Sequence, residues 1–226
     1  MRKNGFTLVE AIVAMAVGAI IMAAVYGYMS LVQKNSANAD RKIVTQQDTR
    51  SVLELMATEI RMASYLPAPC NMSTWLTIPA CAEMPGWGGT GIKINKGIQV
   101  ADANKIFVAM DLNGDGGIGP PGASEYIMYY YDGASTLSRD VSCSGMQAIL
   151  GGSAPFSNVR NAAAGVPLFR YYDRNNTLLA APISIPAIRR ILITIVADTA
   201  DKDLNTKQYK RMVYSTSVVV RNHGLN

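Results

Sequence analysis

The fold of this chain is decided by residues 1–32, which read MRKNGFTLVEAIVAMAVGAIIMAAVYGYMSLV. A basic leader, 1–5, is followed by Phe6-Thr7-Leu8-Val9-Glu10 and then by an uncharged apolar run, 11–32. A helix of these 22 residues rises about 33 Å, enough to cross the hydrocarbon core of a bilayer. A secretory signal peptide has its small-residue cleavage site after the apolar region, whereas here the small residue, Gly5, precedes it. Cleavage at Gly5 would therefore leave the apolar helix on the mature chain.

Glu10 is the single charged residue between Gly5 and Val32. A carboxylate in hydrocarbon costs roughly 2.5–3.5 kcal/mol even on the lenient insertion scale. Glu10 either lies near the interface and reaches water without a further role, or it gains a cationic partner when the helix enters a protein core. An unpaired charge is costly in such a core, so pairing there would be a driving force.

The pattern Gly5-Phe6-Thr7-Leu8-x-Glu10 at the head of an apolar helix resembles the signature of type IV prepilins. The resemblance implies that prepilin peptidase cleaves after Gly5 and methylates the new amino terminus, Phe6. It also implies that Glu10 pairs with the terminal amine of a neighbouring subunit and so drives docking onto a filament.

The helix is predicted to continue through residues 33–65 as an amphipathic segment. Residues 34–65 contain no Gly or Pro, and Pro67 and Pro69 end the pattern. The stripe predicted to face a sheet consists of Val44, Asp48, Val52, Leu55, Met56, Ile60 and Ala63. The charged residues Arg50, Glu54, Glu59 and Arg61 are expected on the solvent face, and Gly27 is the expected position of a bend.

Residues 66–226 are predicted to form an antiparallel β head domain that begins with a Pro- and Gly-rich loop, 66–91. The expected strands are 91–95, 105–111, 125–131, 136–139, 167–172, 189–198 and 208–222. Asp132-Gly133 and Asn175-Asn176 are typical of turns. No helical pattern of 10–15 residues separates the later strands, which argues against βαβ units. The predicted class is α+β, with a long amino-terminal helix packed on an antiparallel sheet.

Several segments resemble PilW-like minor pilins in the same order along the chain: 48–65, 106–116, 125–130, 137–139 and 220–225. In the first of them Ser64 replaces the glycine that such sequences often carry. The related J-type pseudopilins of type II secretion have a looser version of this segment.

The resemblance implies a minor pilin that helps to initiate type IV pilus assembly. A location at the pilus tip is compatible with this role. The implied location is the inner membrane, with a cytoplasmic amino terminus and a periplasmic head, and then the pilus. The implied partners are prepilin peptidase, the inner-membrane assembly platform, other minor pilins and the major pilin. A pseudopilin at the tip of a secretion pseudopilus is the alternative, and a surface- or DNA-binding module on a pilus is the alternative of another class.

The charge of the chain argues against nucleic acid as a partner. The formal charge of +5 falls to +3 when Arg2 and Lys3 leave with the leader, and no stripe of alternating basic and aromatic residues is evident. An enzyme is not expected either, because phosphate-loop, dinucleotide and zinc patterns are missing from the sequence. Cys143 and His223 are the one conceivable thiol–imidazole couple, and no signature surrounds them.

Residues 111–116 begin like a calcium loop, with side-chain oxygens on Asp111, Asn113 and Asp115. The twelfth position, where a bidentate acid is expected, is Gly122, and Glu125 lies three residues later. A polar turn between two strands accounts for the same residues. Residues 111–116 are therefore interpreted either as a calcium-binding loop or as a plain turn. No other cofactor is expected.

The three cysteines belong to a chain predicted to reach an oxidising compartment. Cys70 and Cys81 bracket a ten-residue loop and are predicted to form a disulfide, which would stabilise the fold by roughly 3 kcal/mol. Cys143 is either reduced and buried or paired with one of the other two.

Overall fold

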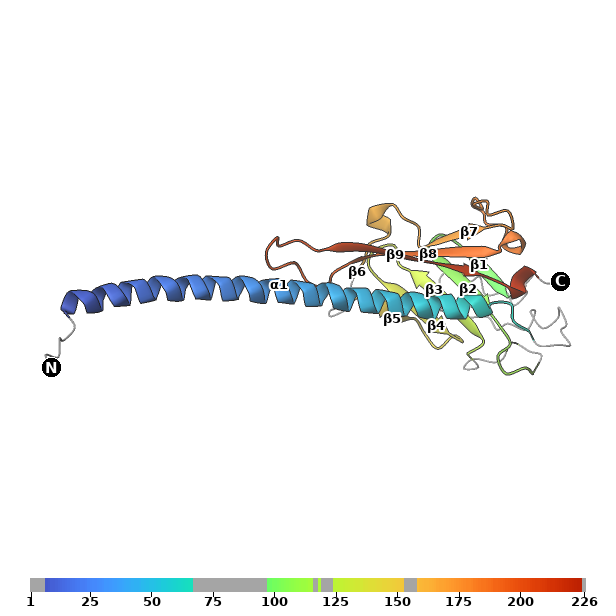
Figure 1. Ribbon diagram of the computed structural model, residues 1–226. Coiled ribbons are helices and arrows are strands. Elements are labelled where there is room, and N and C mark those ends of the chain that lie inside the picture. The colour runs from blue at the N-terminus through green and yellow to red at the C-terminus, as the bar shows by residue number, and fades with distance from the viewer. Residues whose placement is uncertain (1–6, 67–96, 116–117, 119–123, 153–157, 225–226) are drawn as a thin grey trace.

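The computed structural model describes residues 7–66, 97–115, 118, 124–152 and 158–224. Figure 1 shows one long helix, α1 (Leu8–Met62), whose amino-terminal half projects away from a β head. The carboxyl-terminal half of α1 lies along that head. The predicted α+β class, with a long helix on antiparallel sheet, is confirmed.

A capping box begins α1. The Thr7 hydroxyl accepts a hydrogen bond from the Glu10 N–H at 3.3 Å, and the Glu10 carboxylate accepts one from the Thr7 N–H at 2.9 Å. The helix then runs without interruption through Gly18 and Gly27 to Met62. The bend predicted at Gly27 does not break the helix, because one glycine costs only about 1 kcal/mol and its neighbours favour a helix.

Two antiparallel sheets form the head, where the sequence had predicted one. Sheet A contains, in spatial order, β1 (Ile98–Ala101), β2 (Lys105–Ala109), β3 (Tyr126–Tyr131), β4 (Leu137–Val141) and β5 (Gln147–Leu150). In sheet B, β8 (Arg190–Asp198) pairs with β6 (Asn158–Val159), β7 (Phe169–Tyr172) and β9 (Arg211–Val219). Short 3₁₀ turns lie at Ala162–Ala164, Ile185–Ala187 and Asn222–Gly224.

The sequence located six of these strands and missed β1, β5 and β6. The three missed strands have two to four residues each, too few for alternation to be recognised. The strand expected at 91–95 lies outside the described residues. The turn at Asp132-Gly133 is confirmed: Asp132 Oδ1 accepts the N–H groups of Ala134, Ser135 and Thr136 at 2.7, 2.9 and 3.0 Å. Partial burial works against ionisation there, but these N–H groups outweigh it and lower the pKa of Asp132.

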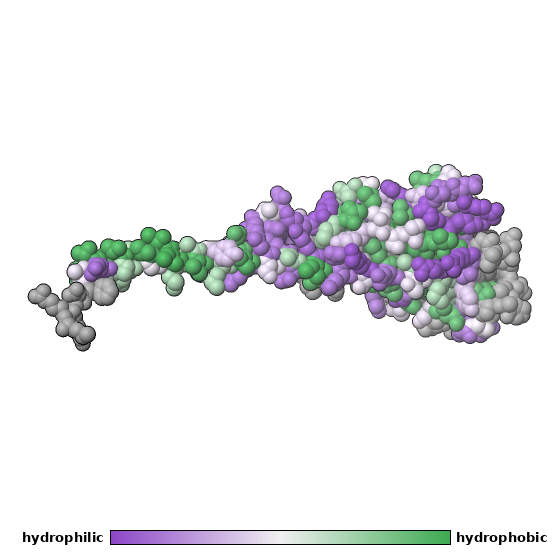
Figure 2. All heavy atoms as spheres, viewed as in Figure 1, coloured by the Kyte–Doolittle hydropathy of each residue, from purple (hydrophilic) through white to green (hydrophobic). Residues whose placement is uncertain are grey.

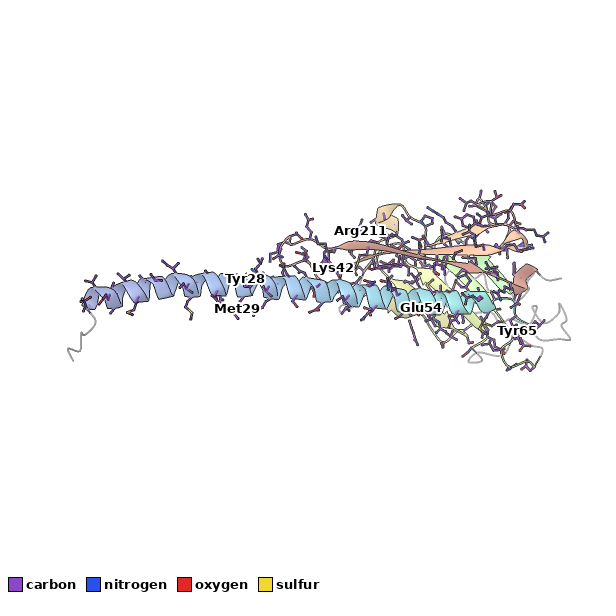
Figure 3. The ribbon with its side chains drawn as sticks, in the orientation of Figure 1. Tyr28, Met29, Lys42, Glu54, Tyr65 and Arg211 are labelled. Carbon is purple, nitrogen blue, oxygen red and sulfur yellow. The ribbon has the colours of Figure 1, made fainter. Side chains whose placement is uncertain are left out.

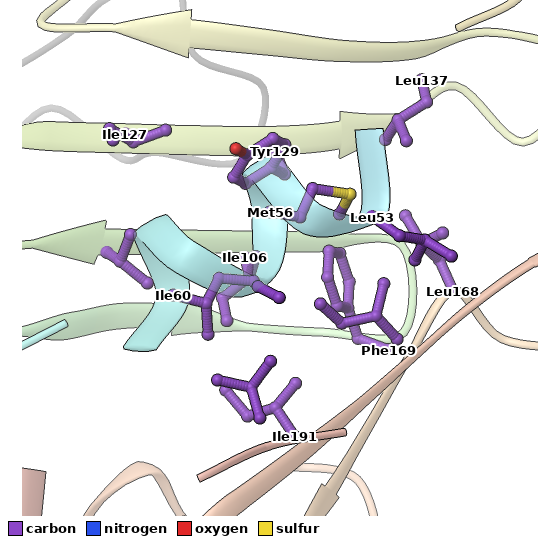
Figure 4. Packing of buried hydrophobic residues seen from close by; sticks show 14 of the residues in the cluster. Leu53, Met56, Ile60, Ile106, Ile127, Tyr129, Leu137, Leu168, Phe169 and Ile191 are labelled. Atoms are coloured by element: carbon purple, nitrogen blue, oxygen red, sulfur yellow. The ribbon is translucent and has the colours of Figure 1, made fainter. Parts of the chain in front are cut away.

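The core lies between α1 and both sheets, as Figure 4 shows for Met56 and Ile60 against Tyr129, Ile106 and Ile191. The buried residues of α1 are Asn38, Thr45, Thr49, Val52, Leu53, Met56, Ala57 and Ile60. Three positions of the predicted stripe are therefore wrong, because Val44 and Leu55 are exposed and Asp48 is not among the buried residues.

Threonines occupy two of the buried positions that the sequence had not assigned to the core. Thr45 Oγ1 donates to the Arg41 carbonyl at 3.0 Å, and Thr49 Oγ1 donates to the Thr45 carbonyl at 2.7 Å. A hydroxyl that is hydrogen-bonded within its own helix can be buried at little cost, and this is why polar residues continue the stripe.

The carboxyl-terminal end of α1 is fastened to sheet A. The Ser64 N–H donates to the Ala109 carbonyl at 3.0 Å, and the Asp111 N–H donates to the Tyr65 carbonyl at 2.9 Å. Ser64 has a φ of 65°, in the left-handed region that glycine adopts without strain. The Ser64 hydroxyl also lies 2.8 Å from His223 Nδ1, so the end of the chain contacts the end of α1.

Candidate functional site

The amino-terminal half of α1 presents an apolar surface that nothing in the described part of the chain covers. Leu8 and Tyr26 are both 78% exposed, and every large apolar side chain from Leu8 to Val32 is exposed. Figure 2 shows this segment as a nearly continuous hydrophobic rod, and Figure 3 shows Tyr28 and Met29 on it. The head begins where the loop between β8 and β9 reaches α1 at Asn35 and Asn38. Among the described residues, α1 is the one helix long and apolar enough to cross a membrane.

Glu10 lies on this apolar surface, one turn into the helix. It lines a shallow groove with Val9, Val13, Ala14, Val17, Gly18 and Ile21. Ala14 and Gly18 are four residues apart, a spacing that lets another helix approach closely. The Glu10 carboxylate accepts hydrogen bonds from the Thr7 N–H and hydroxyl at 2.9 Å each, and no cation among the described residues pairs with it.

Residues 1–26 match the family model described as the prokaryotic N-terminal methylation motif. The chain carries a prepilin-type amino terminus. No curated protein and no solved structure matches the chain. The matched segment contains Gly5, Phe6 and Glu10, of which Gly5 and Phe6 lie outside the described residues. The motif, the apolar helix and the α+β head together indicate a membrane-anchored, pilin-like protein that is a substrate of prepilin peptidase.

A buried polar cluster joins the pilin-like helix to sheet A. Arg139 Nε donates to Glu59 Oε2 at 3.0 Å, the second guanidinium nitrogen also contacts Glu59, and the Tyr129 hydroxyl donates to the same carboxylate. The Glu59 side chain is 15% exposed, so the prediction that it lies on the solvent face is wrong. Burial, followed by the hydrogen bond to Glu59, raises the pKa of Tyr129 far above its ordinary value. The exposed positions of Arg50, Glu54 and Arg61 agree with the prediction.

The predicted calcium loop is organised by hydrogen bonds within the chain. Asp111 Oδ1 accepts the Gly114 N–H at 2.7 Å, and Asn113 Nδ2 donates to Asp115 Oδ2 at 2.8 Å. Glu125, which is fully buried, accepts the Leu112 N–H at 3.2 Å and the Asn113 N–H at 3.3 Å. These are the bonds of a polar turn, and within the described residues no group of three His, Cys, Asp or Glu side chains could hold a metal ion. Calcium binding by Asp111, Asn113 and Asp115 stays a prediction.

Cys143 is disulfide-bonded. Its possible partners, Cys70 and Cys81, both lie outside the described residues. Because the chain has three cysteines, a disulfide at Cys143 and one between Cys70 and Cys81 exclude each other within one molecule.

We expect Cys143 to be oxidised in the mature protein. Peptide mapping of non-reduced protein should recover Cys143 linked to a peptide that contains Cys70 or Cys81. Recovery of a Cys70–Cys81 pair with a free thiol at Cys143 would instead support the pairing predicted from sequence. The same digest after reduction is the control, because it should release both peptides.

The thiol–imidazole couple considered from sequence has neither of its groups available. Cys143 is oxidised, and His223 is buried with both ring nitrogens engaged. His223 Nε2 lies 2.8 Å from the Ile185 carbonyl, which can only accept, so this nitrogen carries the proton. Nδ1 lies 2.8 Å from the Ser64 hydroxyl, from which it accepts when the ring is neutral.

Several arginines lie at the end of sheet B farthest from the free helix tip. The small net charge of the whole chain gave no indication of this local cluster. The Arg190 guanidinium lies 3.8 Å from the ring centroid of Tyr172, and Arg170 follows on the same face of β7. Arg174 and Arg189 are close in the chain to these residues, and Arg221 follows Val220, whose N–H donates to the Arg189 carbonyl. None of these five arginines forms an ion pair within the described part of the chain. The prediction that nucleic acid is not a partner remains untested.

Proposed function

We propose that this protein is a minor pilin of the PilW-like kind that helps to initiate assembly of a type IV pilus. It acts by association and carries out no catalytic step. Prepilin peptidase cleaves it after Gly5 and methylates Phe6, and the mature chain joins other minor pilins and the major pilin through the exposed part of α1. The matched segment 1–26 supports the processing, and the order of PilW-like segments along the chain supports the choice of family.

The observation that carries the proposal is the Glu10 carboxylate, which has no cationic partner among the described residues and lies on an otherwise apolar, exposed part of α1. In the membrane Glu10 is costly, by roughly 2.5–3.5 kcal/mol on the insertion scale. In a filament core the terminal amine of a neighbouring Phe6 would neutralise it, and Coulomb attraction is strong at low dielectric. The free energy of the charge therefore falls when the subunit leaves the lipid and docks.

Deletion of the gene and complementation with Glu10→Ala test the proposal. We expect both strains to lose pili and piliation-dependent motility, while the Glu10→Ala protein remains inserted in the inner membrane. Alanine removes the charge that favours docking but leaves an apolar helix that still inserts. Pilus counts by electron microscopy and membrane fractionation are the measurements.

Asp40→Ala is the matched control, because Asp40 is an exposed acid on the same helix with no ion pair among the described residues. It should keep normal pilus numbers. Normal pili in both the deletion and the Glu10→Ala strain would refute the assembly role, and a defect confined to protein secretion would favour a pseudopilus. Mass spectrometry should find an amino-terminal N-methylated Phe6; an intact Met1 would contradict the processing step.

A further inference from the structure

The free edge of β9 is a long strand edge that lacks the usual protection. β9 pairs with β8 on one side, residue for residue from Arg211 to Val219 and without a bulge. The edge strands of sheet A differ, since β1 and β5 have four residues each and each pairs with a register shift. Charges, prolines, bulges or short length normally protect an edge strand from pairing. In β9 the one charged residue is Arg211 at its start, which is paired with Asp198 of β8, and the remaining residues, 212–219, include no charge, proline or bulge.

The hydrogen-bond register identifies which backbone groups face the free edge. Bonds from the Thr199 N–H to the Lys210 carbonyl and from the Val220 N–H to the Arg189 carbonyl, both 3.0 Å, bracket the ladder. Even-numbered residues of β9 therefore bond to β8, and odd-numbered residues direct their N–H and C=O groups outward. These outward groups belong to Arg211, Val213, Ser215, Ser217 and Val219, all of which are exposed.

A groove runs beside this edge, between α1 and β9. It has a volume of about 680 Å³, and it is lined by Arg50, Leu53, Glu54, Ala57, Thr58, Arg61, Tyr214, Ser215 and Thr216. None of these residues belongs to β8, so the groove opens on the side of β9 turned away from its partner strand. From Arg50 to Arg61, α1 rises about 17 Å, which is the length of roughly five residues of an extended strand.

The orientation of β9 restricts what can occupy the groove. β9 runs in the same direction as α1: the loop that precedes it contacts Asn38, and the residues that follow it contact Ser64 (Figure 1). Antiparallel pairing of β9 with β9 of a second copy would point the two α1 helices in opposite directions. Two chains anchored in one membrane through α1 cannot adopt that arrangement, which excludes an antiparallel β9–β9 pair and favours a strand of a different subunit.

We propose that β9 and the groove beside it accept an extended strand from a neighbouring, different pilin-like subunit, which adds to sheet B. The inference rests on the proposed function, since a subunit bundled against residues 8–32 of α1 also lies beside its later half. The outward backbone groups of β9 supply the hydrogen bonds, and alternate side chains of the incoming strand contact Leu53 and Ala57 in the groove.

Ser215→Pro tests the backbone part of this proposal in the full-length protein expressed in its own bacterium. The ring removes the outward N–H of residue 215 and leaves the bonds from β9 to β8 intact. We expect normal protein levels, a near-normal melting temperature and at least a tenfold fall in pilus number. Ser215→Ala is the control, because it shortens the side chain, keeps the N–H and should leave pilus number unchanged.

Val213→Lys keeps the test decisive if the proline variant does not fold. Val213 is 62% exposed, so lysine there leaves the core intact while it places a charge on the edge. We expect the same loss of pili, with Val213→Thr as the neutral control. Normal pilus numbers in folded Ser215→Pro or Val213→Lys protein would overturn the proposal.

A photo-cross-linking amino acid at residue 217 identifies the neighbour independently of pilus number. The expected product joins residue 217 to a strand of another pilin-like chain. Products with a second copy of this chain, with a protein that is not pilin-like, or with no protein would overturn the strand-addition proposal. Glu10→Ala run in parallel separates the two ideas: if it abolishes pili and the β9 variants do not, the assembly role stands and the β9 site falls. If Glu10→Ala leaves pili intact, the proposed assembly role is rejected. The cross-link at residue 217 is then the measurement that tests strand addition to β9.

Discussion

Glu59→Ala is expected to lower the free energy of unfolding of the head by about 3–5 kcal/mol, because it leaves a mostly buried Arg139 without its counter-ion. Glu59 is also the acceptor of the Tyr129 hydroxyl, so its loss removes the partners of two buried donors at once. In a domain of this size the change corresponds to a fall in melting temperature of roughly 6–20 °C. Thermal unfolding of the full-length protein in detergent, followed by circular dichroism, is the measurement.

Glu54→Ala provides the matched comparison for this prediction. Glu54 is on the same helix, is exposed, and has no ion pair among the described residues. Its replacement should change the stability by less than about 0.5 kcal/mol. A similar small loss in Glu59→Ala would show that the cluster contributes no more than a surface pair. Rescue of most of the stability by Glu59→Gln would show that hydrogen bonding matters more than charge.

Gly97→Ala is the second change with a large expected effect. A Cβ atom at Gly97 would lie 2.1 Å from the Ser64 hydroxyl and 2.4 Å from both Cα and N of Ser64. Two of these atoms are backbone and are held by the bond from the Ser64 N–H to the Ala109 carbonyl, so they cannot move aside cheaply. Gly97 also has a φ of 65°. Left-handed backbone costs about 1–2 kcal/mol for alanine, and overpacking adds typically 1–3 kcal/mol, so we expect a loss of about 2–5 kcal/mol.

Gly165→Ala separates the two contributions, because Gly165 has the same φ of 65° and no atom within 4 Å of the Cβ position. It should cost only the backbone part, about 1–2 kcal/mol. Equal losses in the two variants would contradict the predicted collision with Ser64. Chemical denaturation of both variants with the wild type, in the same detergent, measures the difference.

The β head shows where reading the sequence succeeded and where it could not. β2, β3 and β8 were located because each is a largely apolar run bounded by turn residues, a signal carried by the strand itself. β4 and β7 are more polar, but each lies next to a recognisable turn, Asp132-Gly133 or Asn175-Asn176. β9 was also recognised, but with three extra residues at each end. The division of these strands into two sheets, and the short strands β1, β5 and β6, depend on pairings across the head. Such pairings leave no trace in local periodicity.

The amino-terminal segment could be interpreted from the sequence because its features are local. The leader, the position of Gly5, the apolar run and Glu10 are contiguous, and the match of residues 1–26 rests on the same contiguous residues. Glu59 was misread as a solvated residue for the opposite reason. Its partner Arg139 is 80 positions away, and helical spacing alone cannot distinguish a charge that meets a distant arginine from one that meets water.

The sequence by itself therefore determined a long helix with a membrane-length apolar half, the acid within it and an antiparallel β head, because each follows from the chemistry of neighbouring residues. The tertiary structure alone decided that Ser64 lies against Gly97, that Cys143 is oxidised, that Arg139 neutralises Glu59 and that one edge of β9 stays open. These features form only when segments distant in the chain are brought together by burial of the common core between α1 and the two sheets.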